Sequence, residues 1–494
     1  MHDSRADSAD PRARLPGLFA LLAVACVMLA GCATNPVTGK RELSLVSSSK
    51  EMEIGREGYP AAIEEYGKYD DTALAAYVDS VGQRVAHASH LPNLEWHFTV
   101  LDDPTVNAFA MPGGYIYITR GIIAHLNSEA QLAGVLGHEI GHVTHRHTAE
   151  QMTQQQLVGL GYTALQIGVP QLQQYDPLEQ QALGLFFLSY SRSHESEADE
   201  LGVSYATLAG YDPREIPSTY AMLKRVSQAS GSNIPAFLST HPDPGNRETR
   251  TAQLASQAAA GKSGLRIGQR DYLRHVEGVV YGRDPREGYF EGQRYLNPSL
   301  DFQIDFPPGW KAQDSRSAVQ AAEPSQRGVV QLSLAKAGDA SPAAFAQSLL
   351  TSGQALAAEG GGETIGGYTA WTGRIVVKGQ SGAVHLDVAF IRVSPQTMFE
   401  ILGESAVAGD PIEGAIFGTM RTFRAIEERA RLNVQPARVH LAEALSAGTL
   451  GALLPGLGAS GATPDETAIL NNLELDQPLG AGKTVKVVRP STLR

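Results

Sequence analysis

Cysteine is nearly absent from the sequence of 494 residues. The two that occur, Cys26 and Cys32, both lie near the N-terminus. No disulfide can form among the residues after Cys32, so the fold must be stable without crosslinks. Cysteine content therefore gives no information about the redox state in which the chain folds.

Positive charge is also scarce. Lys and Arg total 40 against 52 Asp and Glu, which gives a formal net charge of -12. The sequence has no basic stripe interleaved with aromatic residues, the pattern that neutralises phosphates and stacks on bases. An acidic protein repels nucleic acid, so we expect no nucleic-acid partner.

A hydrophobic run long enough to span a membrane is missing as well. The apolar stretch from Leu15 to Ala30 falls short of the roughly 20 residues that a spanning helix needs. It ends in Leu29-Ala30-Gly31-Cys32, which resembles the lipobox of bacterial lipoprotein signals. The resemblance implies that residues 1–31 are a signal peptide and that Cys32 carries the lipid. Length argues against the alternative, an uncleaved anchor with an incidental cysteine.

The predicted lipid anchor indicates a location. Position 33 is Ala rather than Asp, which by similarity to sorted lipoproteins favours the outer membrane over retention in the inner one. We therefore expect a periplasmic protein that is tethered by lipid to the inner leaflet of the outer membrane.

The length of the chain favours two or three folded units. We expect a polar tether at 32–49, a mainly helical domain at 50–260, an accessory domain rich in short strands at 261–425 and a small C-terminal module at 426–494. The last segment resembles a LysM wall-binding module, which would make peptidoglycan a partner. The predicted fold class is α+β.

Within the helical domain, periodicity and turn residues predict several elements. They are a helix at 73–88, a strand at 96–101, a hairpin at 107–119, a helix starting after Ser128 with Gln131 in a capping box, and a helix at 180–209. Residues 150–182 fit either a mobile flap or a helical hairpin packed on the core.

The strongest motif is His138-Glu139-Ile140-Gly141-His142. Residues four apart share one face of a helix, so both imidazoles can hold one Zn²⁺ while Glu139 faces the bound water as a base. The alternative is a buried helix with two hydrogen-bonded histidines. Gly137 and Gly141 count against it, because each glycine costs about 1 kcal/mol in a helix and is better explained by close packing around a site.

A catalytic zinc normally has a third protein ligand. The metzincin pattern needs Gly at 145 and His at 148, where this chain has His145 and Thr148, so that class is excluded. The other common solution is a glutamate from a second helix, and Glu195 lies one turn before Asp199. The segment from Ser191 to Asp199 therefore offers two carboxylates, and an outer carboxylate that orients a ligand histidine also fits the chemistry of metal sites.

These motifs together resemble the family of metallopeptidases that includes HtpX, the CaaX prenyl endopeptidases and the BepA-like proteins. The resemblance covers about residues 45–255 and rests on HEIGH, the ExxxD helix from Glu195 and NAFAMPGG at 107–114. It implies a helical zincin-type domain with a small sheet, in which one zinc per chain is bound by His138, His142 and Glu195 and Glu139 is the general base. It also implies that Asp199 is an outer carboxylate that orients His138 or His142.

Two further residues follow from the resemblance. Ser239-Thr240-His241-Pro242 and Arg247 match a pattern in the periplasmic members of this family. It implies that Arg247 stabilises the charged intermediate and that His241 approaches the zinc as a removable fourth ligand. The alternative places His241 at a loop cap and Arg247 in a surface ion pair. His145, His147 and His194 are expected to be structural, and Glu197 to point away from the zinc.

The predicted function is that of a zinc-dependent endopeptidase hydrolysing unfolded or misassembled envelope proteins. Two alternatives stay open. One is a lipid-anchored chaperone or assembly factor with a latched zinc site, and the other is a wall-binding lipoprotein dominated by its C-terminal half.

Overall fold

The computed structural model describes residues 32–157, 189–229, 236–242, 246–379, 382–405, 410–490 and 492–493. The predicted signal peptide at 1–31, most of the predicted flap at 150–182 and the first part of the helix predicted at 180–209 lie outside these residues. No helix among the described residues is long and apolar enough to cross a membrane.

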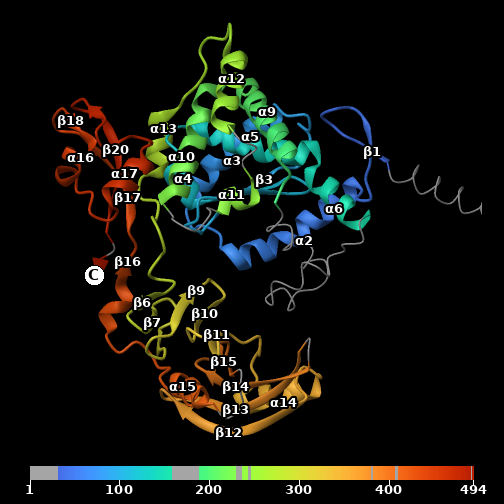
Figure 1. Ribbon diagram of the computed structural model, residues 1–494, viewed down its shortest axis with the longest axis vertical. Coiled ribbons are helices and arrows are strands. Elements are labelled where there is room, and N and C mark those ends of the chain that lie inside the picture. The colour runs from blue at the N-terminus through green and yellow to red at the C-terminus, as the bar shows by residue number, and fades with distance from the viewer. Residues whose placement is uncertain are drawn as a thin grey trace, which may run out of the picture. The chain divides into compact units, whose positions relative to one another are not determined.

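The chain divides into two compact units (Figure 1). Unit 1 comprises residues 1–63, 68–276 and 468–477, and unit 2 comprises 64–67, 277–467 and 478–494. The mixed class is confirmed, with a helical N-terminal region and a β-rich C-terminal one. The domain boundaries themselves stay predictions.

Unit 1 is built mainly of helices. They are α2 (Ser48–Tyr66), α3 (Thr72–His87), α4 (Arg120–His125), α5 (Glu129–His145), α6 (His147–Leu157), α9 (Arg192–Leu208), η3 (Pro213–Glu215), α10 (Ile216–Ala229), α11 (Ala236–Thr240), α12 (Arg247–Ala259) and α13 (Gln269–Val276). The predicted helices at 73–88 and after Ser128 are confirmed.

A three-stranded sheet completes this unit. Its strands β3 (His97–Leu101), β5 (Tyr115–Thr119) and β4 (Ala108–Met111) lie in that order, with β3 parallel and β4 antiparallel to β5. Gly113 and Gly114 have φ of 80° and 94° and form the turn of the predicted hairpin. The predicted strand and hairpin are therefore confirmed, and β4 is an edge strand.

Helix α5 begins and ends with identifiable caps. The Ser128 hydroxyl accepts a hydrogen bond from the Gln131 amide at 3.2 Å, as predicted, but the Gln131 side chain bonds Asn127 rather than closing the box. At the other end, Arg146 adopts a left-handed conformation with φ of 62°. Its guanidinium is held by Glu51 at 2.7 Å, which secures a conformation that side chains other than glycine rarely adopt.

Glycines let α5 approach α9 backbone to backbone. A Cβ on Gly137 would lie 3.1 Å from the carbonyl oxygen of Gly202, and a Cβ on Gly202 would lie 3.0 Å from the amide nitrogen of His138. A Cβ on Gly141 would lie 3.3 Å from the Cα of Ala198. The close packing sets the acidic residues of α9 beside the two histidines of α5.

Residues 32–49 differ from the polar tether expected. Strand β1 (Cys32–Thr34) pairs with β2 (Arg41–Leu43), and the Asn35 amide donates to the carbonyl oxygen of His145 at 3.1 Å. The Leu45 amide donates to the Thr153 hydroxyl at 3.1 Å. The segment is therefore folded against the end of α5 and against α6.

Unit 2 contains a seven-stranded antiparallel sheet. In spatial order its strands are β12 (Ala357–Ile365), β13 (Tyr368–Gly379), β14 (Gly382–Arg392), β15 (Met398–Ser405), β11 (Gly328–Leu334), β10 (Ala318–Ala322) and β9 (Lys311–Asp314). Three more strands, β6 (Tyr289–Glu291), β7 (Arg294–Asn297) and β8 (Phe302–Asp305), form a second sheet.

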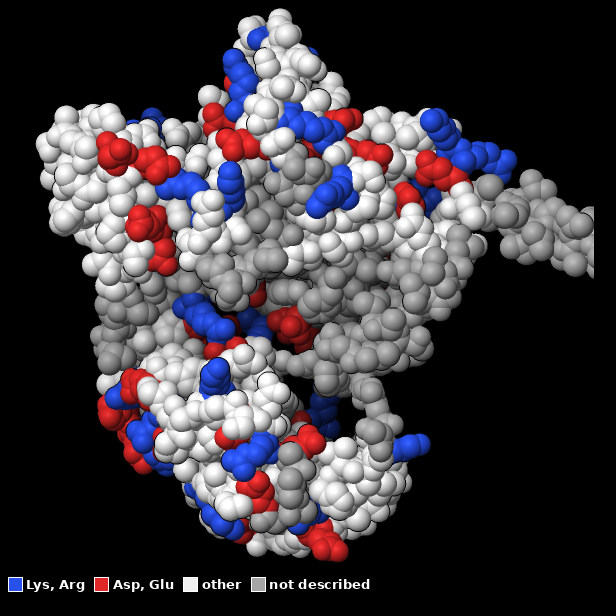
Figure 2. All heavy atoms as spheres, in the orientation of Figure 1, with Lys and Arg blue, Asp and Glu red and all other residues white. Residues whose placement is uncertain are grey.

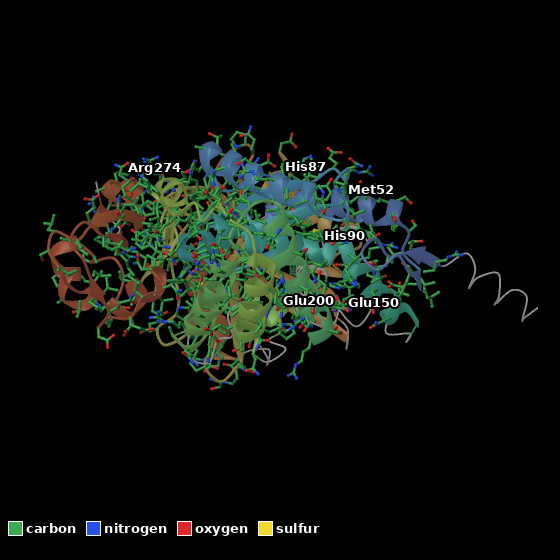
Figure 3. The ribbon with its side chains drawn as sticks, turned by 90° about the horizontal axis from the view of Figure 1, so that it is seen from above. Met52, His87, His90, Glu150, Glu200 and Arg274 are labelled. Atoms are coloured by element: carbon green, nitrogen blue, oxygen red, sulfur yellow. The ribbon has the colours of Figure 1, made fainter. Side chains whose placement is uncertain are left out.

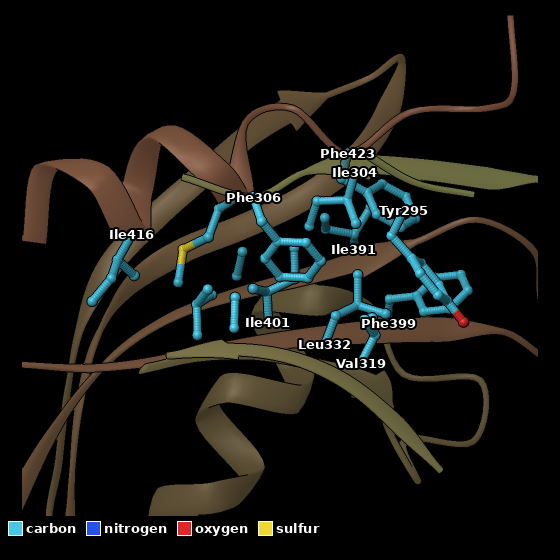
Figure 4. Packing of buried hydrophobic residues seen from close by; sticks show 14 of the residues in the cluster. Tyr295, Ile304, Phe306, Val319, Leu332, Ile391, Phe399, Ile401, Ile416 and Phe423 are labelled. Atoms are coloured by element: carbon cyan, nitrogen blue, oxygen red, sulfur yellow. The ribbon is translucent and has the colours of Figure 1, made fainter. Parts of the chain in front are cut away.

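Both faces of the long sheet are covered. Helix α15 (Pro411–Met420) and the β6–β8 sheet cover one face, where Phe302, Phe399 and Phe423 pack in the core shown in Figure 4. Helix α14 (Pro342–Thr351) covers the other around Trp371 and Phe390. Alternating apolar residues are typical of strands in such a sheet, because every second side chain faces the same layer.

The C-terminal segment is made of short elements. They are η4 (Arg429–Asn433), β16 (Val434–Gln435), β17 (Arg438–Glu443), β18 (Gly448–Thr449), α16 (Leu450–Leu453), η5 (Leu454–Leu457), α17 (Pro464–Leu470), β19 (Pro478–Leu479), β20 (Thr484–Arg489) and β21 (Thr492–Leu493). β17 pairs with β20, and α16 and α17 lie between these two strands in the chain. Most of the segment belongs to unit 2, whereas 468–477 belong to unit 1.

On the face shown in Figure 2, basic and acidic side chains are interspersed.

Candidate metal centre

Four side chains from three places in unit 1 converge on one point. The Nε2 atoms of His138 and His142 lie 3.1 Å apart, and Glu195 has its carboxylate oxygens 3.5 and 3.6 Å from them. His241, which follows α11, brings its Nδ1 within 3.4 Å of His138 and 3.0 Å of Glu195. The structure thus brings together all four ligands that the sequence predicted.

The spacing of these atoms fits zinc. Zn–N and Zn–O bonds of about 2.0–2.2 Å at tetrahedral angles place ligand atoms roughly 3.3–3.6 Å from one another. Imidazole nitrogens and a carboxylate are donors that zinc accepts, and all four residues are buried. The site therefore fits one zinc ion, with the three predicted ligands and His241 in the fourth position.

Asp199 and Arg247 form an outer layer behind His138. Asp199 Oδ1 lies 3.1 Å from His138 Nδ1 and accepts a hydrogen bond from Arg247 at 2.6 Å. Arg247 also lies 3.0 Å from Glu195. At 3% exposure Arg247 is not in a surface ion pair, so that alternative is excluded. Asp199 contacts His138 of the two histidines considered, and catalysis by Arg247 stays a prediction.

Glu139 lies beside the ligands without being one of them. It is fully buried, and neither of its carboxylate oxygens has a hydrogen-bond partner among the described residues. The nearest cationic or imidazole nitrogen recorded is His241 Nε2 at 3.7 Å. A buried carboxylate without a partner is costly, so its presence here points to a reacting group rather than a structural one.

Burial and neighbouring charges set the ionisation of the site. Burial raises the pKa of Glu139 above 4.5 and lowers that of His142 well below 6.5, which leaves the ring neutral, the form that binds zinc. Burial lowers the pKa of His138, but the Asp199 and Glu195 carboxylates outweigh it and raise the value to about 9. Zinc would therefore displace a proton from His138. Burial raises the pKa of Asp199, but Arg247 and His138 hold it near 2.

Sequence reasoning missed three residues of the site. Tyr220 donates to Asp199 at 2.6 Å, and its ring packs against the guanidinium of Arg247. Tyr190 stacks on His142 at 3.8 Å between ring centroids. His147 lies 2.9 Å from His142 and was expected to be structural. Nothing in the local sequence signals either tyrosine, because both come from segments brought in by the fold.

Three other residues considered in the sequence, Glu197, His194 and Cys32, lie outside the set of zinc ligands. Glu197 does not belong to the zinc set, as expected, and forms a separate group with His145 and His147. His194 pairs with Glu150 at 3.3 Å. Cys32 is described only through its backbone in β1, so its lipidation stays a prediction.

Two histidines four residues apart on one helix, a glutamate from a second helix and a neighbouring glutamate form the arrangement that zinc metallopeptidase sites use. Residues 72–255 match the model of Peptidase family M48. The resemblance seen in the sequence is confirmed.

Curated relatives agree with this family. The mitochondrial metalloendopeptidase OMA1 of Arabidopsis thaliana is 33% identical over 230 residues, which cover 44% of this chain and 46% of that protein. The beta-barrel assembly-enhancing protease of Escherichia coli strain K12 is 29% identical over 234 residues, which cover 45% of this chain and 47% of that protein. The chain spans about half the length of the curated relatives it matches.

Proposed function

We propose that this chain is a zinc-dependent endopeptidase that hydrolyses peptide bonds of unfolded or misassembled envelope proteins. The convergence of His138, His142 and Glu195, with the unpartnered Glu139 beside them, is the observation that carries the proposal. Similarity to a beta-barrel assembly-enhancing protease supports the class of substrate. The envelope location rests on the predicted signal peptide and on Cys32.

Zinc at this centre would lower the pKa of a water molecule toward about 7 and polarise the substrate carbonyl. Glu139, whose pKa is raised by burial, accepts the proton from that water and returns it to the leaving amine. Asp199 holds His138 by its Nδ1, and Arg247 offsets the charges of Asp199 and Glu195. The residues therefore supply a base, a proton donor and a fixed ligand frame.

The preference for unfolded substrates has a direct test. The purified full chain is incubated with one outer-membrane protein in two states, kept unfolded or folded in detergent, and fragments are measured over time. The proposal predicts cleavage of the unfolded state and little of the folded one. Equal cleavage of both would contradict the quality-control part of the proposal but not the peptidase class.

His241 favours a second candidate, a lipid-anchored chaperone or assembly factor with a latched zinc site. With its Nδ1 3.0 Å from Glu195 and 3.4 Å from His138, His241 fills the fourth position, which a catalytic zinc keeps open for water. In this arrangement the site has no open ligand position. Removal of the imidazole distinguishes the two candidates, as described in the Discussion.

We further propose that the C-terminal segment, residues 426–494, binds peptidoglycan. The proposal is supported by the pairing of β17 with β20 along six residues, with α16 and α17 between the two strands in the chain. Sedimentation of the full chain with purified peptidoglycan, compared with a chain ending at 425, tests this. Equal binding by both would contradict it.

A further inference from the structure

A chain of hydrogen bonds leaves the metal centre on the side of His142. The Nδ1 atom of His142 lies 2.9 Å from Nδ1 of His147, and Nε2 of His147 lies 3.1 Å from a carboxylate oxygen of Glu197. His147 is fully buried, whereas the Glu197 side chain is 43% exposed. These hydrogen bonds therefore connect the buried metal centre to the surface of α9.

Only one distribution of protons satisfies all three groups. Nε2 of His142 faces His138 and Glu195, so this atom is free of a proton when it binds zinc, and the proton of the ring is on Nδ1. That N–H must donate to His147, whose Nδ1 is then the acceptor. The proton of His147 is on Nε2, from which it donates to Glu197.

We propose that His147 and Glu197 are positioning residues that fix the tautomer and ring orientation of the zinc ligand His142. The inference rests on the proposed zinc peptidase. Asp199 orients the His138 ring directly, with its carboxylate oxygen 3.1 Å from Nδ1 of His138. For His142, His147 and Glu197 together have this role. Both ligand histidines of α5 then have their second nitrogen bonded to an oriented acceptor, as is usual at metal sites.

The end of α5 builds this arrangement. His142 and His147 are five residues apart, a spacing that would not put them on one face of a continuous helix. The left-handed Arg146 ends α5 and turns the chain, so that His147 opens α6 beneath His142. His194 stacks on the His147 ring at 4.4 Å with an angle of 13°, which limits rotation of that ring.

A second metal site is the rival explanation. His145, His147 and Glu197 offer ligand atoms within 4.8 Å of one another. A metal on Nε2 of His147 would leave the proton of that neutral ring on Nδ1, and zinc does the same at His142. Two N–H groups would then face each other at 2.9 Å, so occupation of both sites is disfavoured.

Zinc affinity of the full chain, measured by competition with a chromogenic chelator, tests the proposal independently of peptidase activity. His147→Leu is expected to weaken zinc binding by about 10–100-fold, the usual effect of losing such a partner. Glu197→Gln removes the charge but keeps an oxygen that accepts from His147, so it should weaken zinc binding by less. His147→Gln keeps an oxygen that accepts from His142 and should recover part of the affinity. Thermal unfolding in excess chelator checks that the variants are folded.

Glu200→Gln is the matched control. Glu200 lies on the same helix, one turn from Glu197, but pairs with Arg250 instead, and its position is labelled in Figure 3. Its zinc affinity should equal that of the wild type. Folded Glu197→Gln and His147→Leu variants that bind zinc as tightly as the wild type would overturn the proposal. Two zinc ions per wild-type chain, reduced to one by Glu197→Gln, would also overturn it in favour of a second metal. Zinc binding without peptide cleavage would contradict the proposed function alone.

Discussion

Three carboxylates, those of Glu139, Glu195 and Asp199, are buried within one site. Isolated buried charges cost several kcal/mol each, and Arg247 supplies one compensating positive charge at 2.6 Å from Asp199 and 3.0 Å from Glu195. A divalent cation between His138, His142 and Glu195 would offset the rest. The charge pattern and the ligand geometry therefore point independently to the same ion.

Replacement of His241 by alanine tests the latch. If His241 holds the fourth position closed, His241→Ala should raise the rate of casein cleavage severalfold, because the freed position can bind water. The initial rate at saturating casein and the zinc content are measured together. The matched control is His87→Gln, since His87 is exposed and, among the described residues, bonds only the carbonyl of Gln83 in its own helix. A fall in rate with zinc retained would contradict the latch and indicate a catalytic role for His241.

At the scale of elements, the approach of α5 to α9 decides whether the ligands meet. A Cβ at position 137 would already lie 3.1 Å from the carbonyl oxygen of Gly202. Gly137→Val adds two methyl groups beyond that Cβ, for which the contact leaves no room. We expect unit 1 to lose about 1–3 kcal/mol of unfolding free energy and zinc affinity to fall, because the helices must separate. Denaturant unfolding with zinc titration measures both quantities.

Gly414→Val is the control for this change. Gly414 lies within α15, where an added Cβ meets no atom within 4 Å. The unfolding free energy of unit 2 should change by less than about 0.5 kcal/mol. A loss at Gly137 no larger than that would show that the contact between α5 and α9 is not tight.

The helix of the HEIGH motif was predictable because its cap and its apolar spacing agree. The position of His147 was not, since it depends on the left-handed conformation of Arg146, which Glu51 secures from a distant part of the chain. The folding of residues 32–49 against α5 was equally hidden, because Asn35 acts through a contact 110 residues away. Local sequence patterns indicate helix caps and the apolar faces of helices. They do not indicate contacts between residues that are far apart in the sequence.

At the scale of the whole molecule, the metal centre belongs to one of two compact units. Such chains commonly unfold in separate steps. A chelator should lower the temperature of the transition that includes unit 1 and leave the other unchanged, since a ligand at 100 times its Kd contributes about 2.7 kcal/mol to the state that binds it. Calorimetry with and without chelator measures this. A shift of both transitions would show that zinc stabilises more than unit 1.

The division into a helical part and a β-rich part was predictable from the change of periodicity near residue 261. The inclusion of residues 468–477 in unit 1 was not, because the pairing of Arg225 with Leu473 and Glu474 joins positions that no local pattern connects.

The most direct test of the central claim compares the full wild-type chain with Glu139→Gln in casein degradation, with zinc per chain measured in both. The amide keeps the shape of the side chain but cannot take a proton from water. The account predicts one zinc per chain in both proteins and a loss of cleavage of about 10²–10⁴-fold in the variant. Cleavage at the wild-type rate by Glu139→Gln, or a wild-type chain that binds no zinc, would contradict it.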